Sequence, residues 1–401
     1  MSTILTIDTG TTNTRVSLWR KGQAISRHAM PVGVRNSAIN GSHTMLQTAV
    51  RDTIATCLAQ AGVAPEEVNL ALASGMISSP LGLHQMPHLS APAGLSDLAL
   101  RLEAVTLHEV FSRPIWFIPG VRNRLPVDTQ PGTTPKQNEA AGAVTISLEN
   151  CEAMDMMRGE ETEVFALQAG MRIRGAATLV MPGSHTKIIA LDEEGRIAGC
   201  ATTLAGELMQ NITTNTILAD SLQSQFASSI NPKMVLAGAA LAQKSGVGRA
   251  CFSIRIMDQF ADSSANDRAN FLLGALLSED VKAMKNSSAI SLRGDTPVIV
   301  AGKGVARQAL ALLIKEDDFF SGTLAVVNDA QNSLLSGYGA LRIARERGLL
   351  PRSDGNASAE DQLGDQQLHE LFQGLQDSTS TWHVNASVGG ARPLDAHPQH
   401  L

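Results

Sequence analysis

The fold is decided by Ile4-Leu5-Thr6-Ile7-Asp8-Thr9-Gly10-Thr11-Thr12-Asn13-Thr14-Arg15-Val16-Ser17-Leu18-Trp19, which predicts a β-strand, a tight turn and a second strand. The carboxylate of Asp8 falls where the first strand ends, and Gly10 lets the backbone approach a ligand because it carries no Cβ. Turn N–H groups and hydroxyl groups together form a polar cup suited to phosphate and to a hydrated metal ion. Taken alone, the turn is also compatible with an ordinary hairpin. Its hydroxyl groups belong to Thr9, Thr11, Thr12 and Thr14.

The composition is that of a globular protein with an aliphatic core. Hydrophobic residues make up 43% of the 401 residues and aromatic residues only 3%, so Leu, Val, Ile, Ala and Met must build the core. A chain of this length predicts two or three domains. The net charge of -6 argues against non-specific nucleic-acid binding, which needs a positive field, but it leaves a local anion site open.

The cysteine pattern and the lack of long apolar runs predict an intracellular setting. The four cysteines lie far apart without a C-x-x-C spacing, which is typical of reduced core residues rather than of disulfides or a metal site. No basic segment followed by an apolar run is seen near residue 1, and no stretch reaches the ~18 apolar residues of a membrane span. We therefore expect a cytoplasmic protein that binds neither nucleic acid nor membranes.

The first half of the chain predicts a mixed α/β domain. Strands are expected at 23–31 and 69–73, and residues 43–61 predict a helix between them. Apolar residues recur every four positions in this helix, which places them on one face. They are Leu46, Val50, Ile54 and Leu58. A long loop is expected at 75–94, and an exposed excursion at 122–150.

The opening pattern returns in the second half of the chain. A strand at 177–181, the polar turn Pro182-Gly183-Ser184-His185-Thr186 and a strand at 187–191 are followed by a third strand at 196–202. The recurrence lies in the architecture and not in sequence identity. It predicts an α/β protein of two similar domains with mixed sheets and a cleft between them.

The predicted domain boundaries follow from this recurrence. We place the first domain at 1–170 and the second at 171–350. From Pro351 the composition changes to Gln, Asp, Ser, Ala and Gly with few large apolar residues. Such a composition cannot bury much apolar surface, so we expect a mobile tail at 351–401 and assign it no function.

A strand, a glycine turn and a helix are expected late in the second domain. Residues 297–301 predict a buried strand of the parallel type, Gly302-Lys303-Gly304 a turn, and 305–314 a helix. Such a unit can seat a nucleotide, but a lone G-x-G is also compatible with a plain strand-to-helix turn. The other elements expected in this half are helices from after Leu208 to about residue 228, at 267–285 and at 331–347, and a strand at 323–327.

A cluster of carboxylates precedes an apolar run that is typical of a helix. It reads Asp155-Met156-Met157-Arg158-Gly159-Glu160-Glu161-Thr162-Glu163. Acidic residues are favourable at the positive end of a helix, so the cluster is compatible with simple helix-start charge. Gly159 argues against this interpretation, since an ordinary helix avoids glycine there.

Two similar domains with polar turns and a late strand–glycine–helix unit resemble the sugar-kinase and actin-like ATPase superfamily, whose domains are ribonuclease-H-like. A series of motifs spans about residues 4–345: Gly75-Met76, Pro87-x-Leu89-Ser90-Ala91-Pro92, Ile118-Pro119-Gly120, Met157-Arg158-Gly159-Glu160-Glu161-Thr162, Met181-Pro182-Gly183-Ser184-His185-Thr186-Lys187 and Gly206-Glu207-Leu208. This series is similar to the motifs of the 2-dehydro-3-deoxygalactonokinase family. That resemblance implies ATP-dependent phosphorylation of the terminal 6-hydroxyl of 2-dehydro-3-deoxy-D-galactonate in galactonate catabolism, with Mg expected.

Three features depart from the pattern of that family. Ile188 stands where the family usually has Trp, and Lys303 stands where small or hydroxyl residues are usual. The excursion at 122–150 is longer than expected. These departures concern nucleotide and substrate contacts and leave the reaction class unchanged.

We assign ATP and Mg to the first phosphate turn (10–13), the second phosphate turn (182–186) and the glycine turn. Asp8 is expected near Mg, through water, and the two phosphate turns are expected to hold the phosphates of ATP. Lys187 could add positive charge, although a lysine on a strand is more often merely solvated. The predicted nucleotide-binding residues are Asp8, Gly10, Thr11, Thr12, Asn13, Gly183, Ser184, His185, Thr186, Lys187, Gly302 and Gly304.

The predicted catalytic base is Asp155, because a helix N-terminus would keep its carboxylate ionised, and Glu160 and Glu161 are its rivals. An anionic sugar acid needs hydrogen-bond donors and a cation. Arg15 is an alternative cation, but pairing with a nearby acid would explain it equally well. The predicted substrate-binding residues are Gly33, Val34, Gly75, Met76 and Arg158.

Two other functions are compatible with the sequence. A kinase for a related 2-keto-3-deoxy sugar acid would have the same motifs, since the epimers differ at one hydroxyl. A non-catalytic sensor of ATP or sugar with the actin-like fold is an alternative of another class, but a binding module needs no carboxylate cluster. A homodimer is an expectation that the sequence itself does not support.

Overall fold

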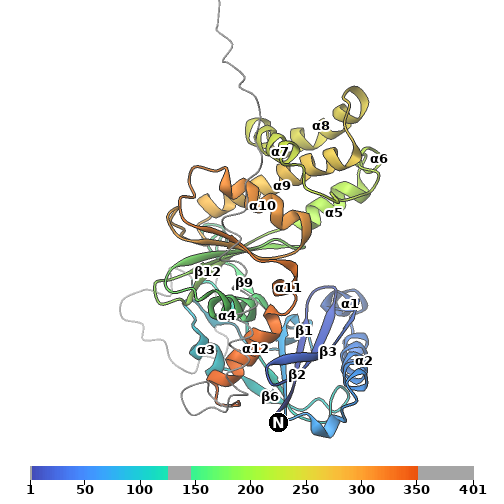
Figure 1. The fold of residues 1–401 in the computed structure, drawn as a ribbon, viewed down its shortest axis with the longest axis vertical. Helices are drawn as coiled ribbons and strands as arrows, with labels where there is room; N and C mark the ends of the chain where they lie inside the picture. Colours follow the sequence, from blue (N-terminus) through green and yellow to red (C-terminus); the bar gives the residue numbers. More distant parts are fainter. Residues whose placement is uncertain (1, 125–145, 351–401) are drawn as a thin grey trace, which may run out of the picture.

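The strand, turn and strand between Ile4 and Trp19 are confirmed. In this computed structural model, which describes residues 2–124 and 146–350, β1 (Thr3–Thr9) and β2 (Thr14–Arg20) pair antiparallel (Figure 1). The remaining strands of the first sheet are β3 (Gln23–Met30), β4 (Leu70–Gly75), β6 (Glu103–Val105) and β7 (Ile115–Phe117). Their order is β3-β2-β1-β4-β7-β6, with β1, β4 and β7 parallel to one another. The predicted strands at 23–31 and 69–73 are therefore both present.

The second sheet repeats this arrangement. Its strands are β10 (Ala177–Met181), β11 (Thr186–Leu191), β12 (Ile197–Thr203), β13 (Val298–Val300) and β14 (Leu324–Val326). Their order is β12-β11-β10-β13-β14, with two antiparallel pairs followed by two parallel pairs. Counted from β3, the first sheet has the same sequence of pairings over five strands. The predicted duplication is confirmed by this shared topology.

A small third sheet connects the two halves. It contains β5 (Leu89–Ser90), β8 (Val121–Arg122) and β9 (Met156–Met157) in the order β5-β8-β9. An isolated bridge joins Ala93 to Ile197 of β12, so segments from the first half of the chain are attached to the second sheet.

The helix α2 (Thr44–Gln60) covers one face of the first sheet, as its periodicity predicts. Its four periodic residues are buried in one cluster with Leu5, Ile7 and Val16 of β1 and β2. A short helix, α1 (Val34–Asn40), which the sequence does not predict, begins directly after Gly33. The 75–94 stretch is mostly irregular, as expected, and leads into α3 (Leu95–Leu100).

Two helices lie between the sheets (Figure 1): α4 (Glu160–Met171) and α12 (Leu335–Glu346). Residues of both helices share one apolar cluster with residues of both sheets, including Trp19 and Leu179. The division at residue 171 separates the strands of the two sheets. Nevertheless α12, from the second segment, packs against α4, so the two helices join the halves into one core.

A helical layer is inserted between β12 and β13, beyond the second sheet (Figure 1). The helix predicted from after Leu208 to about residue 228 is too long at its C-terminal end, because the chain becomes extended at Thr216. The helix predicted at 267–285 is confirmed. The structure has two helices between residues 229 and 266 that were not predicted from the sequence. The helices of this layer are α5 (Ala205–Asn215), α6 (Leu218–Ser221), α7 (Pro232–Ser245), α8 (Val247–Phe260) and α9 (Ala265–Asn286).

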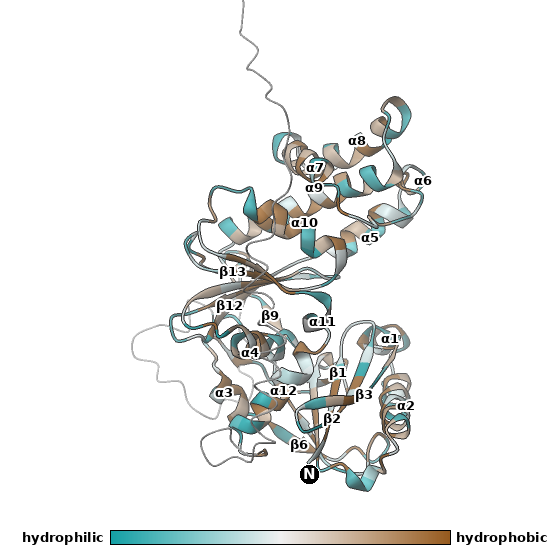
Figure 2. Ribbon diagram, viewed as in Figure 1, coloured by the Kyte–Doolittle hydropathy of each residue, from teal (hydrophilic) through white to brown (hydrophobic). Residues whose placement is uncertain are grey.

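The late strand–glycine–helix unit is confirmed as β13 followed by α10 (Gly304–Lys315). Figure 2 shows strongly apolar colouring along β13, as expected for a strand buried on both faces. The helix predicted at 331–347 is interrupted, because α11 (Asp329–Asn332) ends before α12 begins.

Two predicted segments lie wholly or mostly outside the described residues: the excursion at 122–150 and the tail at 351–401. In the ranges 2–124 and 146–350, no helix combines the length and the apolar character that crossing a membrane requires.

The close contact between α12 and α4 gives a stability prediction. A Cβ at Gly339 would lie 1.8 Å from the carbonyl oxygen of Thr162, so Gly339→Ala must push the two helices apart. Overpacking of this kind costs about 1–3 kcal/mol, and we expect the free energy of unfolding in urea to fall by that amount. The control is Gly248→Ala on α8, where nothing lies within 4 Å of the added Cβ. Equal unfolding midpoints for the two variants would contradict the packing.

Candidate active site

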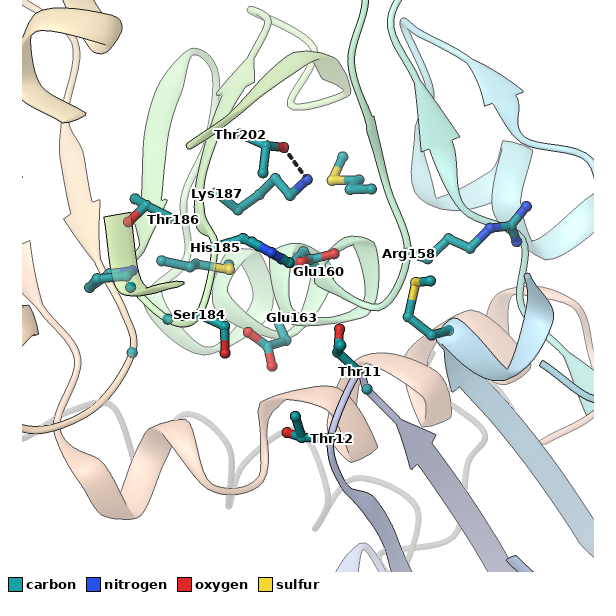
Figure 3. A pocket seen from close by; sticks show the side chains of 18 of the residues that line it. Thr11, Thr12, Arg158, Glu160, Glu163, Ser184, His185, Thr186, Lys187 and Thr202 are labelled. Atoms are coloured by element: carbon teal, nitrogen blue, oxygen red, sulfur yellow. Dashed lines mark hydrogen bonds between the residues drawn. The ribbon is translucent and has the colours of Figure 1, made fainter. Parts of the chain in front are cut away.

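A cleft of about 1170 Å³ brings most of the predicted site residues together. Both phosphate turns, the glycine turn and the start of α4 contribute to its wall. Figure 3 shows labelled side chains of the two phosphate turns and of α4 around this cleft. The predicted residues that line it are Asp8, Gly10, Thr11, Thr12, Asn13, Met76, Asp155, Arg158, Glu160, Gly183, Ser184, His185, Thr186, Lys187 and Gly302. The predicted residues that do not line it are Gly33, Val34, Gly75, Glu161 and Gly304.

The first phosphate turn is held from behind by the start of α1. The Gly10 N–H donates to the carbonyl oxygen of Asn13 at 2.8 Å, and the Val34 N–H donates to that of Gly10 at 3.2 Å. A Cβ at Gly33 would lie 2.5 Å from the carbonyl oxygen of Gly10. Gly33 and Val34 therefore support the turn, which explains why they are near the site without lining the cleft.

Two cationic side chains, Arg15 and Lys303, act on the carboxylate of Asp8. Arg15 donates to its Oδ2 at 3.1 Å. Burial raises the pKa of Asp8, and the charges of Arg15 and Lys303 oppose that rise. Gly75 has a positive φ of 84°, which favours glycine. A Cβ added at this position would lie 3.1 Å from Asp8 Oδ1. The absence of a side chain at Gly75 thus leaves space for the Asp8 carboxylate.

Two carboxylates of α4 line the cleft, Glu160 and Glu163. Glu160 Oε2 is buried and has no hydrogen-bond partner among the described residues. The pKa of Glu163 is raised to about 8, first by burial and then by the negative charges of Asp8 and Glu160. The sequence prediction did not select Glu163. Its place one helical turn after Glu160, on the same face, is the signal that could have identified it.

Glu161 does not line the cleft and belongs to the helix start. It is fully buried, and its two carboxylate oxygens accept hydrogen bonds from the Gly159 N–H at 2.9 and 2.8 Å. Burial raises its pKa to about 8. A Cβ at Gly159 would lie 3.2 Å from the Cα of Gly75, so the glycine permits α4 to begin directly against β4.

Asp155 lies in the cleft wall with its oxygens engaged by protein donors. The N–H of Thr202 donates to Oδ2 at 2.5 Å, and the Thr202 hydroxyl donates to Oδ1 at 2.9 Å. The Met156 N–H also donates to Oδ1, at 2.6 Å. Lys187 is buried beside this group, with its Nζ 4.0 Å from Oδ1. It is therefore not a solvated strand lysine.

Arg158 is tied to the loop that follows β4. Its guanidinium donates to Ser78 Oγ at 2.9 Å, to the carbonyl oxygen of Met86 and to His88 Nδ1 at 3.3 Å. Burial, followed by the charge of Arg158, lowers the pKa of His88 to about 4, so this histidine is neutral at neutral pH. Figure 3 shows Arg158 extending away from Glu160 and Thr11, at one end of the cleft.

The second phosphate turn packs on the start of α5. A Cβ at Gly206 would lie 2.0 Å from the carbonyl oxygen of Gly183, so only glycine fits at this helix start. The Glu207 N–H donates to the carbonyl oxygen of Ser184 at 2.9 Å. Glu207 Oε1 also lies 3.0 Å from His185 Nε2, and this contact orients the imidazole at the cleft edge.

The glycine turn lies directly against the second phosphate turn. A Cβ at Gly302, whose φ is 98°, would lie 2.7 Å from the carbonyl oxygen of Pro182. Asn332 accepts a 2.9 Å hydrogen bond from the Gly302 N–H. Arg307 donates to the Gly302 carbonyl oxygen at 3.0 Å and fixes the turn from the other side. The apolar part of the nearby wall is formed by Met209, Phe226, Leu277 and Ala306.

The carboxylates of the cleft fit a magnesium ion that is shared with phosphate groups. The described residues contain no cluster of three or more His, Cys, Asp or Glu side chains suited to hold a metal by themselves. Mg²⁺ usually keeps several waters and takes only one or two carboxylates beside substrate phosphates. Asp8 and Glu163, which both line the cleft and repel each other electrostatically, provide two such carboxylates.

The chain matches the family model described as 2-keto-3-deoxy-galactonokinase over residues 8–130 and 141–328. No curated protein sequence matches it significantly. Its structure is similar to the crystal structure of a Sinorhizobium meliloti protein that is provisionally assigned as a 2-dehydro-3-deoxygalactonokinase. The TM-score is 0.64, with 19% sequence identity over 88% of this chain and 99% of that chain.

Two further structures have lower similarity. One is the activator of 2-hydroxyisocaproyl-CoA dehydratase from Clostridium difficile with bound ADPNP. Its TM-score is 0.43, with 13% identity over 89% of this chain and 100% of that chain. The other is component A of (R)-2-hydroxyglutaryl-CoA dehydratase from Acidaminococcus fermentans. Its TM-score is 0.42, with 11% identity over 86% of this chain and 96% of that chain.

The support beneath the second phosphate turn gives a pH prediction. Asp280 on α9 is 1% exposed and accepts a 2.5 Å hydrogen bond from Thr203, and burial raises its pKa from 3.8 to about 6. Between these pH values Asp280 is protonated to a greater extent in the folded protein than in the unfolded chain, so its contribution to stability falls as the pH rises. Asp280→Asn removes this loss.

We therefore expect Asp280→Asn to gain stability relative to the parent protein between pH 4 and pH 7, measured by urea unfolding. Gly248→Ala, which changes no ionisable group and adds a Cβ with nothing within 4 Å, is the control and should show a constant difference from the parent. A stability difference for Asp280→Asn that does not change with pH would contradict the assignment.

Proposed function

The chain belongs to the 2-keto-3-deoxy-galactonokinase family and is a sugar-acid kinase; from this premise we propose that it phosphorylates the 6-hydroxyl of 2-dehydro-3-deoxy-D-galactonate with ATP. The observation that supports the proposal most strongly is the cleft itself. Two phosphate turns and an unpartnered carboxylate at a helix start share its wall. Phosphoryl transfer requires this combination, in which donor phosphates are positioned beside a base.

The proposed nucleotide site extends from the phosphate turns to the glycine turn. Backbone N–H groups and hydroxyls of the first turn would bind the β- and γ-phosphates, and the second turn would bind them from the other side. The adenine ring would lie on the apolar wall that contains Met209, Phe226 and Ala306. Lys303, a departure from the family pattern, lies in the cleft and would add a positive charge near the phosphates.

We place Mg²⁺ at Asp8 and Glu163, with the phosphates completing its coordination. When bound, the ion would neutralise part of the charge on the phosphates. Without a metal ion, the pKa of Glu163 is raised to about 8. The positive charge of a bound magnesium ion would oppose this rise and favour the ionised carboxylate.

Glu160 is the base that the geometry favours, in place of the predicted Asp155. Asp155 uses its carboxylate oxygens on Thr202 and Met156, whereas Glu160 Oε2 has no partner. As the 6-hydroxyl oxygen attacks the γ-phosphorus, the Glu160 carboxylate would accept the hydroxyl proton. The bond from the γ-phosphorus to the bridging oxygen then breaks, and ADP leaves with that oxygen.

The sugar acid would occupy the end of the cleft near Arg158. Neutral His88 and the Arg158 guanidinium lie there, beside Ser79 and the apolar residues Met76 and Leu81. A carboxylate would be attracted by the positive charge, and an unsubstituted methylene would pack against the apolar side chains. Gly33 and Gly75, which were predicted to bind substrate, would act indirectly through the turns that they support.

A related 2-keto-3-deoxy sugar acid remains the alternative substrate, and ADP release separates the candidates. Purified protein, ATP and magnesium are incubated with a panel of 2-keto-3-deoxy acids, and ADP is measured by a coupled assay. We expect kcat/KM to be highest for 2-dehydro-3-deoxy-D-galactonate. A higher value for the C4 epimer would favour the alternative. Protein that binds ATP but releases no ADP with any acid would favour a sensor and overturn the kinase proposal.

The base assignment predicts a difference between two variants. Glu160→Gln removes the proton acceptor, and we expect kcat to fall by at least about 100-fold. Asp155→Asn keeps an oxygen that accepts from the Thr202 N–H, so kcat should fall only about tenfold. Rapid quench of single turnovers measures the chemical step directly. A larger loss in Asp155→Asn than in Glu160→Gln would return the base to Asp155.

A further inference from the structure

The ammonium group of Lys187 is committed to protein acceptors. The residue is 5% exposed, and its Nζ donates to the carbonyl oxygen of Met156 at 2.8 Å and to Thr202 Oγ1. Figure 3 shows the side chain running along the cleft wall toward Thr202. Asp155 Oδ1 lies 4.0 Å from the same Nζ, which is an ion-pair distance and not a hydrogen bond. Lys187 therefore neutralises a carboxylate of the wall.

The hydrogen bonds around Thr202 have a single consistent direction. Because an ammonium group can only donate, the Thr202 hydroxyl accepts from Lys187 and gives its own proton to Asp155 Oδ1 at 2.9 Å. The Thr202 N–H donates a hydrogen bond to Asp155 Oδ2. The three side chains thus form a continuous chain of hydrogen bonds that runs from Lys187 through Thr202 to Asp155 and joins β11, β12 and the residue that precedes β9.

This chain of hydrogen bonds connects the two parts of the proposed reaction centre. Lys187 directly follows Thr186 of the second phosphate turn, whereas Asp155 and Met156 begin the segment that runs to Arg158 and Glu160. We propose that Lys187, Thr202 and Asp155 are a positioning network that holds the 155–160 segment at a fixed distance from the second phosphate turn. The inference rests on the proposed function, because that segment carries the proposed base.

A direct contact between Lys187 and phosphate would conflict with these bonds. To reach a phosphate, the ammonium group would have to leave the Met156 carbonyl oxygen and expose the Asp155 charge without its counter-ion. Buried polar groups that lose their partners are costly, and the loss would disturb the segment that must receive the sugar hydroxyl. The network therefore acts on the placement of Glu160.

The test separates positioning from phosphate binding by kinetics. For Lys187→Met we expect kcat to fall about 100-fold, because a displacement of about 1 Å in a reacting group can cost that much. The KM for ATP should change less than threefold. Thr202→Val should lower kcat in the same way, and Thr202→Ser, which keeps the hydroxyl, should restore it. The double variant Lys187→Met/Thr202→Val should be no slower than Lys187→Met alone, since both break one network.

The control is Lys282→Met on the exposed face of α9, which should match the parent protein. A rise of tenfold or more in the KM for ATP in Lys187→Met, with kcat retained, would overturn the network and make Lys187 a phosphate ligand. The network would also be overturned if the losses of kcat in the two single variants multiplied in the double variant. The same holds if the kcat of Thr202→Ser were as low as that of Thr202→Val. If Lys187→Met does not fold, the Thr202 pair decides alone. Failure of the parent to release ADP would refute the proposed function instead.

Discussion

The contact of α4 with both sheets is the constraint on which the rest of the molecule depends. Gly159 begins the helix against Gly75, and Gly339 of α12 approaches the Thr162 carbonyl oxygen so closely that neither position tolerates a Cβ without movement. These two contacts therefore fix both the rotation of α4 about its axis and its position between the sheets. That placement buries Glu161 and leaves Glu160 and Glu163 in the cleft.

Charge balance in the cleft follows from this burial. Removing carboxylates from water favours their protonated forms, which is why the pKa values of Asp8 and Glu163 are raised. The cationic side chains Arg15 and Lys303 oppose that effect at both carboxylates. A magnesium ion with bound phosphates would complete the balance, so the arrangement is suited to an anionic nucleotide and an anionic sugar acid.

The two sheets share a pattern of strands but differ in what is attached to them. The second sheet carries a layer of five helices, inserted after β12, that supplies the apolar wall beside the glycine turn. The first sheet has no matching layer among the described residues. His88, on the loop after β4, and Arg158, between β9 and α4, meet in another part of the cleft. In the proposed function, the duplicated fold would provide the two phosphate turns, the inserted helices would line the nucleotide end of the cleft, and the Arg158–His88 pair would line the sugar-acid end.

The sequence by itself determined the strand–turn–strand units, the duplication, the helix at 43–61 and the residues of both phosphate turns. These features depend on local periodicity and on turn residues that lie close together in the chain. The break of the helix at Thr216 and the helices α7 and α8 escaped prediction, because packing within the helical layer decides where those helices end. Only the tertiary structure separated Glu160 from Glu161, since successive helix residues point about 100° apart and burial selects between them. The contacts of Lys187 with Thr202 and Asp155 also could not be predicted from the sequence. The three residues are distant in the chain and meet only because β11, β12 and the 155–160 segment pack together.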